Sequence, residues 1–135
     1  SVNMSRLTMV KCEFNWTKLK KANLSGAYMA DCKFVGANLS GANLSGANLT
    51  GALLTDASLV AADMLEVNLT KADLTDTDMT GASLARAKLV GARMVRTILK
   101  DASLTFADLS NANMIEVVLT GAKTNGAKGL APQKK

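Results

Sequence analysis

Few side chains in this sequence could do acid–base, nucleophilic or metal chemistry. The chain contains no histidine, the commonest general base and metal ligand at neutral pH. Asp76 and Asp78 form a close pair of carboxylates, but they flank a turn and we expect them to be solvated or paired with Lys71 and Arg96. Serine and threonine mostly follow a leucine, where a hydroxyl can bond backbone at a turn. We therefore predict that the protein is not an enzyme and has no catalytic residue, cofactor or metal.

Glycines and cysteines also suggest specific sites, which their context does not support. Gly36, Gly41 and Gly46 belong to a glycine series that invites comparison with a phosphate-binding loop. The series lacks the Gly-Lys-Ser/Thr ending and no helix follows it, so we assign these glycines to turns with positive φ. Cys12 and Cys32 occupy equivalent positions that we expect to be small and to point inward. We therefore expect two inert free thiols, which fits a reducing cytoplasm.

The whole chain follows a short repeat, which must be read before any local propensity because it determines the architecture. Every residue whose number ends in 4 or 9, from Met4 to Leu119, is Leu, Met or Phe, so 24 large apolar residues recur every five positions. In a helix or a flat strand this step would scatter the side chains over several directions. A chain that turns a corner after every pentad keeps them in one core, so we predict a solenoid with one pentad per side.

Four sides per coil fit the sequence better than three. With four sides, residues 20 apart stack about 4.8 Å apart, the spacing of paired strands. Phe14 then stacks on Phe34, and Cys12 on Cys32, whereas three sides would separate the cysteines. Residues 20 apart form a column along the solenoid. The column that contains Phe14 is the predicted core stack: Phe14, Phe34, Leu54, Leu74, Met94 and Met114.

The repeated units, such as Ala42-Asn43-Leu44-Ser45-Gly46, resemble those of the pentapeptide-repeat family over most of the chain. The resemblance implies an all-β fold, a right-handed quadrilateral parallel β-helix (a solenoid) of about six 20-residue coils. Family members are commonly bacterial, especially cyanobacterial, and most have no assigned activity. We expect the β-helix to cover residues 1–124 and residues 125–135 to form a C-terminal tail, partly or wholly disordered. Leu130 either folds back over the last coil or belongs to that tail.

Charge is arranged in bands along the chain, although the total is only +5. Residues 1–40 carry 6 basic and 2 acidic residues (+4), residues 41–80 carry 1 and 6 (−5), and residues 81–135 carry 9 and 3 (+6). Trp16 stands one coil before Gly36, which leaves room for the indole, either as a cover for the solenoid end or as a partner contact. The basic N-terminal end comprises Arg6, Lys11, Lys18, Lys20 and Lys21.

Four β-branched residues near the C-terminal end occupy positions that we predict to face outward. They form two stacks, Val95 with Ile115 and Ile98 with Val118. A contiguous apolar cluster on a surface often marks an interface, whereas β-branched stacking also stabilises a sheet locally. We expect a protein partner or a weak homodimer with two-fold symmetry at this patch, with local sheet stabilisation as the alternative.

These features predict a non-enzymatic protein–protein interaction scaffold whose partner is of unknown identity. The family resemblance adds an alternative, a DNA-mimic protein that binds DNA gyrase or topoisomerase, which the net charge of +5 disfavours. A secreted effector and a nucleic-acid binder acting through the basic ends are further alternatives. We do not expect nucleic acid as a partner, because the basic faces lack interleaved aromatic residues.

The sequence contains no stretch that we expect to contact a membrane. Its longest apolar runs are a few residues, against the ~20 needed to span a bilayer. We expect a cytoplasmic location, and processed export to the periplasm or the thylakoid lumen stays open.

Overall fold

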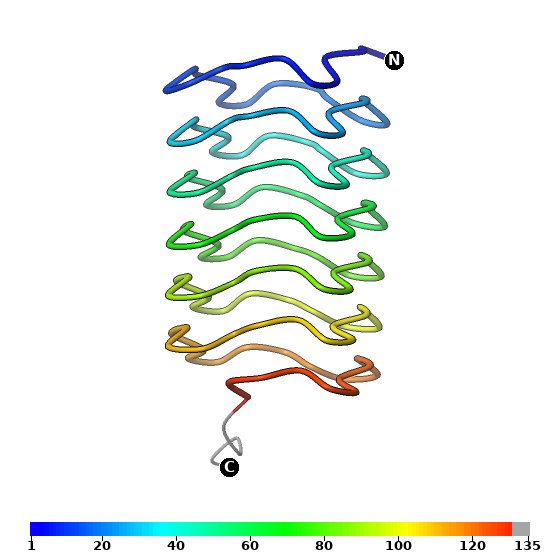
Figure 1. Cartoon of the computed structure of the whole chain (residues 1–135), viewed down its shortest axis with the longest axis vertical. Helices are drawn as coiled ribbons and strands as arrows, with labels where there is room; N and C mark the ends of the chain where they lie inside the picture. The colour runs from blue at the N-terminus through cyan, green and yellow to red at the C-terminus, as the bar shows by residue number, and fades with distance from the viewer. Residues whose placement is uncertain (131–135) are drawn as a thin grey trace.

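The computed structural model describes residues 1–130, which form a stack of coils that begins with the N-terminus at the top of Figure 1 and advances steadily downward. Backbone pairing is parallel and always joins a residue to the one 20 positions later, from Asn3 with Asn23 to Asp108 with Lys128. Each coil therefore contains four pentads, and the predicted right-handed quadrilateral β-helix is confirmed. Residues 2–21, 22–41, 42–61, 62–81, 82–101 and 102–121 are coils one to six, and the beginning of a seventh follows.

Pairing occurs one residue at a time because a corner follows each large apolar residue. Within residues 1–130 there is no helix and no continuous strand, only single paired residues two positions after each corner. We call residues with numbers ending in 4 or 9 central residues, those two positions earlier small residues, and those ending in 1 or 6 corner residues. At every corner from residue 16 to residue 111, the N–H after the corner residue donates to the central C=O before it, as from Ala47 to Leu44 at 3.0 Å.

The corners all adopt one backbone conformation. All 25 corner residues from Arg6 to Gly126 have φ between 56° and 72°, the positive φ that the third position of a type II turn requires. Sixteen of them are not glycine, although a left-handed conformation costs such a residue roughly 1–2 kcal/mol. The hydrogen bonds to neighbouring coils hold these residues in place, so positive φ alone does not determine where glycine occurs.

At several corners, glycine is needed because a side chain of the preceding coil occupies the space that a Cβ would fill. A Cβ on Gly36 would lie 2.0 Å from the Trp16 ring, so the indole covers that glycine as the sequence predicts. Phe106 covers Gly126 in the same way, with a ring atom 2.4 Å from the position of an added Cβ. Around Gly46, by contrast, nothing lies within 4 Å of such an atom. Corner side chains thus lean toward the next coil, and glycine accommodates the bulky ones.

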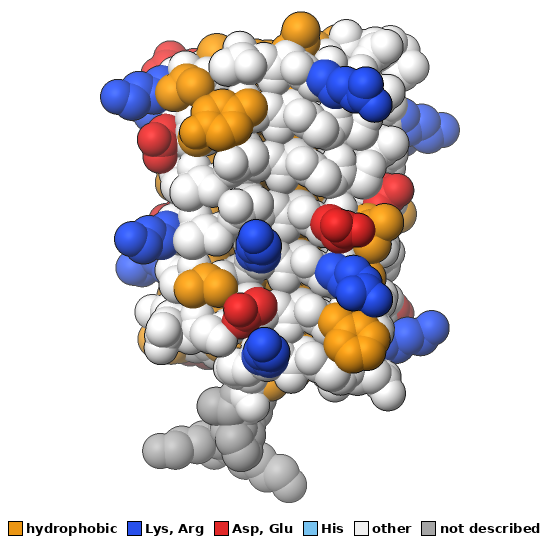
Figure 2. All heavy atoms as spheres, in the orientation of Figure 1, with side chains coloured by type: hydrophobic (Ala, Val, Ile, Leu, Met, Phe, Trp, Pro, Cys, Tyr) orange, Lys and Arg blue, Asp and Glu red, His pale blue; other side chains and the backbone are white. Residues whose placement is uncertain are grey.

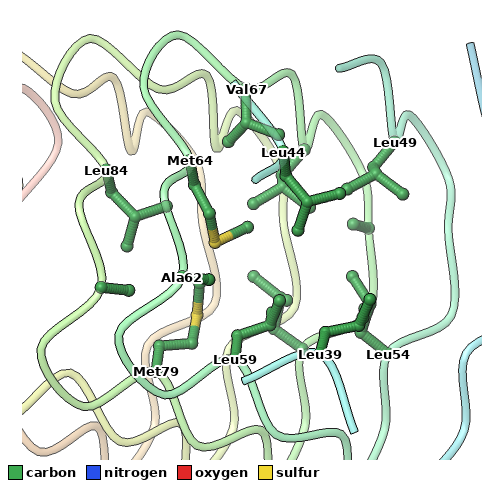
Figure 3. Close-up of a cluster of buried hydrophobic side chains, with 14 of the residues drawn as sticks. Leu39, Leu44, Leu49, Leu54, Leu59, Ala62, Met64, Val67, Met79 and Leu84 are labelled. Carbon is green, nitrogen blue, oxygen red and sulfur yellow. The ribbon is translucent and has the colours of Figure 1, made fainter. Parts of the chain in front are cut away.

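Central and small residues fill a narrow core that runs the length of the solenoid. Figure 3 shows a part of this core, with labelled residues between Leu39 and Leu84. Every central residue from Leu19 to Leu109 is buried. The rings of Phe14 and Phe34 stack with centroids 5.1 Å apart and planes 10° apart. In the predicted core stack, Phe34, Leu54, Leu74 and Met94 are fully buried, whereas the end members Phe14 and Met114 are partly buried.

The hydroxyl after the central residue bonds differently from our expectation. The Ser45 hydroxyl donates to Asn43 Oδ1 at 2.7 Å rather than to backbone, and the same oxygen accepts the Ser45 N–H at 3.0 Å. Thr75 and Asp73 repeat the arrangement with a carboxylate. The side-chain oxygen two residues earlier satisfies a corner N–H and the hydroxyl together. This explains why Asn or Asp precedes the central residue and Ser or Thr follows it.

The regular pairing continues beyond the expected end of the β-helix. Lys123 and Lys128 still pair with Ser103 and Asp108, so the solenoid extends to Lys128 instead of ending at residue 124. Leu130 packs against the core, the first of its two predicted alternatives. The expectation of disorder for the rest of the tail concerns residues 131–135, which lie outside the described residues.

Candidate interaction surfaces

The carboxylates that might have formed a chemical site already have partners. Asp76 receives two bonds from the Arg96 guanidinium, at 2.7 and 2.9 Å, and these bonds lower the pKa of Asp76. Asp78 Oδ1 accepts the N–H and the hydroxyl of Thr80 at 3.0 and 2.6 Å. Among residues 1–130, no three His, Cys, Asp or Glu side chains are grouped to hold a metal ion. The carboxylates therefore stabilise corners and link coils.

Both cysteines are free thiols, and one of them is shielded from solvent. Cys32 is fully buried, and its Sγ donates to the Met9 carbonyl at 2.6 Å. Burial raises the pKa of the Cys32 thiol, which lowers the fraction of reactive thiolate. Cys12 lies one coil earlier and is partly exposed. The pair therefore consists of one protected and one accessible thiol.

The basic N-terminal end divides between one face and two distant corners. We call the face with central residues 19, 39, 59, 79, 99 and 119 the fourth face. Lys18, Lys20 and Lys21 lie on its first coil, whereas Arg6 and Lys11 occupy other corners. Trp16, at the near edge of the fourth face, is 70% exposed. Within the described residues no ion pair involves these three lysines.

The predicted apolar patch is smaller than the sequence suggested, because Val95 is buried and not outward-facing. Only 8% of Val95 is exposed, and its neighbour in the preceding coil, Thr75, is equally covered. Arg93 Nε donates to the Thr75 hydroxyl at 3.2 Å, so the long arginine side chain lies across this column. Ile115 and Val118 are 55% and 41% exposed, respectively.

Three residues of that patch keep exposed surface around one corner of coils five and six. We call them the apolar cluster: Ile98, Ile115 and Val118. Ile98 is half-buried and pairs through its backbone with Val118. Ile98 and Val118 therefore lie on the fourth face in coils five and six, and Ile115 lies just before the corner at which this face begins.

A further exposed aromatic residue escaped the sequence analysis. Phe106 occupies a corner, is 59% exposed, and has the Arg86 guanidinium 5.4 Å from its ring centroid, a cation–π geometry. The available signal was the 20-residue spacing from Phe106 to Gly126, the same as from Trp16 to Gly36. Leu65, 41% exposed, is a further isolated apolar residue. Figure 2 shows that several charged side chains lie directly beside apolar ones on the visible face, within surface that is otherwise mostly neutral.

The family assignment follows from comparison of the repeats. The family described as Pentapeptide repeats matches the chain in 8 copies, in overlapping segments that extend from residue 2 to residue 128. The chain belongs to the pentapeptide-repeat family. No protein with a curated description matches the sequence significantly.

Solved structures of pentapeptide-repeat proteins resemble this one. A protein from the Arabidopsis thaliana thylakoid lumen is 29% identical, with a TM-score of 0.59 over 80% of this chain and 68% of its own. HetL from the cyanobacterium Nostoc, involved in heterocyst differentiation regulation, is 24% identical (TM-score 0.39, 95% and 82% covered). QnrB1, a plasmid-mediated fluoroquinolone resistance protein, is 20% identical (TM-score 0.49, 94% and 74% covered). No helix within residues 1–130 has the length and apolar character needed to cross a membrane.

Proposed function

We propose that this pentapeptide-repeat protein is a non-enzymatic scaffold that binds a protein partner through the apolar cluster. The observation that carries the proposal is the exposure of Ile115 and Val118, at 55% and 41%, on either side of one corner. Together with Ile98 they place three apolar side chains with exposed surface around one corner, and such a group marks an interface more often than isolated exposed side chains do.

The backbone beneath the cluster is rigid, which favours binding. The Ile115 carbonyl accepts the Arg96 N–H at 2.8 Å, and the Val118 carbonyl accepts the Leu99 N–H at 2.8 Å. A partner therefore meets a backbone that is already ordered, so association costs little backbone entropy. A charged rim is supplied by the exposed Glu116, which lies between Ile115 and Val118 in the sequence, and by the Arg96–Asp76 ion pair of the preceding coils.

Affinity capture from the native cell tests this surface with a matched control. Wild-type protein should recover a partner that the double variant Ile115→Lys/Val118→Lys recovers at least tenfold less well, because a lysine in a desolvated contact costs several kcal/mol. Leu65→Lys is the control, since Leu65 is as exposed as Val118, 41%, but lies elsewhere. A partner lost equally with the control variant, or retained by the double variant, contradicts the proposed surface.

The proposed location is the cytoplasm, which the two free thiols support. Export to the periplasm or the thylakoid lumen is the alternative, and the relative from the Arabidopsis thylakoid lumen supports it. Detection of the native protein in separated cell fractions decides between the two locations.

Gyrase binding by DNA mimicry is not the function that we propose. Only residues 41–80 are acidic, while the chain as a whole carries +5. A rod that imitates DNA needs continuous negative charge, which this one lacks. We expect micromolar protein to leave gyrase supercoiling unchanged, and strong inhibition would favour the DNA-mimic alternative instead.

A further inference from the structure

The fourth face carries opposite charges at two levels of the rod. In coil one it presents Lys18 with Lys20 and Lys21, and in coil four it presents Asp78 in the same column as Lys18. That column is continuous through backbone pairs of Lys18 with Asn38, Asn38 with Ser58, and Ser58 with Asp78. At about 4.8 Å per coil, Lys18 and Asp78 stand roughly 14 Å apart along the rod.

The surface between these charges is neutral and made of small groups. Coil two presents Asn38, Ser40 and Gly41, and coil three presents Ser58, Val60 and Ala61. The Ser40 and Ser58 hydroxyls bond each other at 2.8 Å, so they lie along the face. No long side chain interrupts this part of the face, so a second flat surface can approach it closely.

Two-fold symmetry makes this face complementary to itself. When two rods meet face to face in antiparallel orientation, each column faces the same column of the other copy. The two-fold axis then lies in the contact plane, perpendicular to the rods. If this axis passes between coils two and three, coil one faces coil four of the other copy and coil two faces coil three. Lys18 then faces Asp78 of the second copy twice, and Asn38 faces Ser58 twice.

We propose that two copies of this chain pair antiparallel through the fourth face, with Lys18 of each copy against Asp78 of the other. Asp78 has a free acceptor for this contact, because Thr80 takes both of its recorded bonds at Oδ1 and leaves Oδ2 available.

Neighbouring registers of the same pairing are less favourable. A shift by one coil in one direction places Lys18 against Ser58, which loses both ion pairs. A shift in the other direction places Lys18 against Ile98, which loses both ion pairs, and the two attractions of Lys21 with Asp101 are offset by two repulsions of Lys20 with Lys100. Charge therefore selects one register, as complementary charges do in other interfaces.

The proposed contact leaves the apolar cluster uncovered, because coils five and six have no counterpart in this register. The evidence for the dimer is the order of charges along the fourth face, and it is independent of the foreign partner proposed above for the apolar cluster. It replaces the weak homodimer expected from the sequence at the β-branched patch. The area is small, so we expect a dissociation constant on the order of 100 μM, weakened by salt.

Sedimentation velocity over a concentration series to about 1 mM at low ionic strength tests the pairing. Lys18→Asp and Asp78→Lys should each weaken the dimer about tenfold or more, because each replaces two attractions by two repulsions. An equimolar mixture of the two variants should associate about as tightly as wild type, since both contacts are then complementary. Lys88→Asp, the same change in the same pentad position on the opposite face, is the control and should have no effect.

Asp78→Asn provides a second variant that keeps the local fold. Asn38 Oδ1 accepts the Ser40 N–H in the equivalent position, so an amide preserves this bond while removing the charge. The dimer should weaken about threefold, by the loss of two exposed ion pairs. Wild type that stays monomeric at about 1 mM, variants that dimerise normally, or a mixture that fails to associate would each overturn the proposal.

Discussion

Replacing Gly36 with alanine tests whether leaning corner side chains determine the positions of glycine. The added Cβ would lie 2.0, 2.1 and 2.7 Å from three atoms of the Trp16 ring, so the indole must leave. Gly46→Ala makes the same chemical change at almost the same φ, +67° against +65°, with nothing within 4 Å of the new atom. The two variants therefore share the backbone strain and differ only in the clash.

The expected difference in unfolding free energy follows from the covered part of Trp16. Trp16 is 70% exposed, so about a third of an indole surface of roughly 250 Å², or about 75 Å², is buried. At about 25 cal/mol per Å² this burial contributes at most about 2 kcal/mol. We expect Gly46→Ala to cost roughly 1 kcal/mol, from left-handed strain, and Gly36→Ala 1–2 kcal/mol more.

Urea unfolding followed by circular dichroism gives both free energies. Trp16 is the only tryptophan, so its native-state emission reports the displacement directly and should shift to longer wavelength in Gly36→Ala alone. In the background Trp16→Ala, the extra cost of Gly36→Ala should disappear. Equal losses for both glycine variants together with unchanged emission would refute the reasoning, because the indole would then not depend on the missing Cβ.

Three further outcomes are expected. Leu74→Asp should abolish cooperative folding, because Leu74 is fully buried in the mid-rod core and an unpaired carboxylate there costs several kcal/mol; a melt within a few degrees of wild type would contradict this. Arg96 lowers the pKa of Asp76, so their pairing stabilises the protein above the ordinary pKa of about 4 and is lost as pH falls through the lowered value. Arg96→Gln should therefore melt with a smaller difference between pH 7 and pH 3 than wild type; an unchanged difference would exclude this linkage. Iodoacetamide should label Cys12 well before Cys32, as mass spectrometry of digests can show, whereas equal rates would argue against the protection of Cys32.

The inward or outward direction of most side chains was predictable from the sequence. A period of five without insertion leaves one arrangement that gathers all central residues, and the recurrence of Phe14 at Phe34 pointed to four sides. The 20-residue pairs of the backbone and the 5.1 Å stacking of these two rings agree with that reasoning. The physical reason is that each corner restores the same direction, so errors do not accumulate along the chain.

Exposure and bonding partners were decided only by the tertiary structure. The position of Val95 in its pentad is the same whether or not it is covered, and its burial accompanies Arg93 reaching back to Thr75 in the preceding coil. The hydroxyl of Ser45 could bond backbone or Asn43, and the corner geometry selected Asn43. A repeat determines the direction in which a side chain leaves the backbone. How much solvent reaches it depends on the lengths and rotamers of side chains one coil away, which the period does not specify.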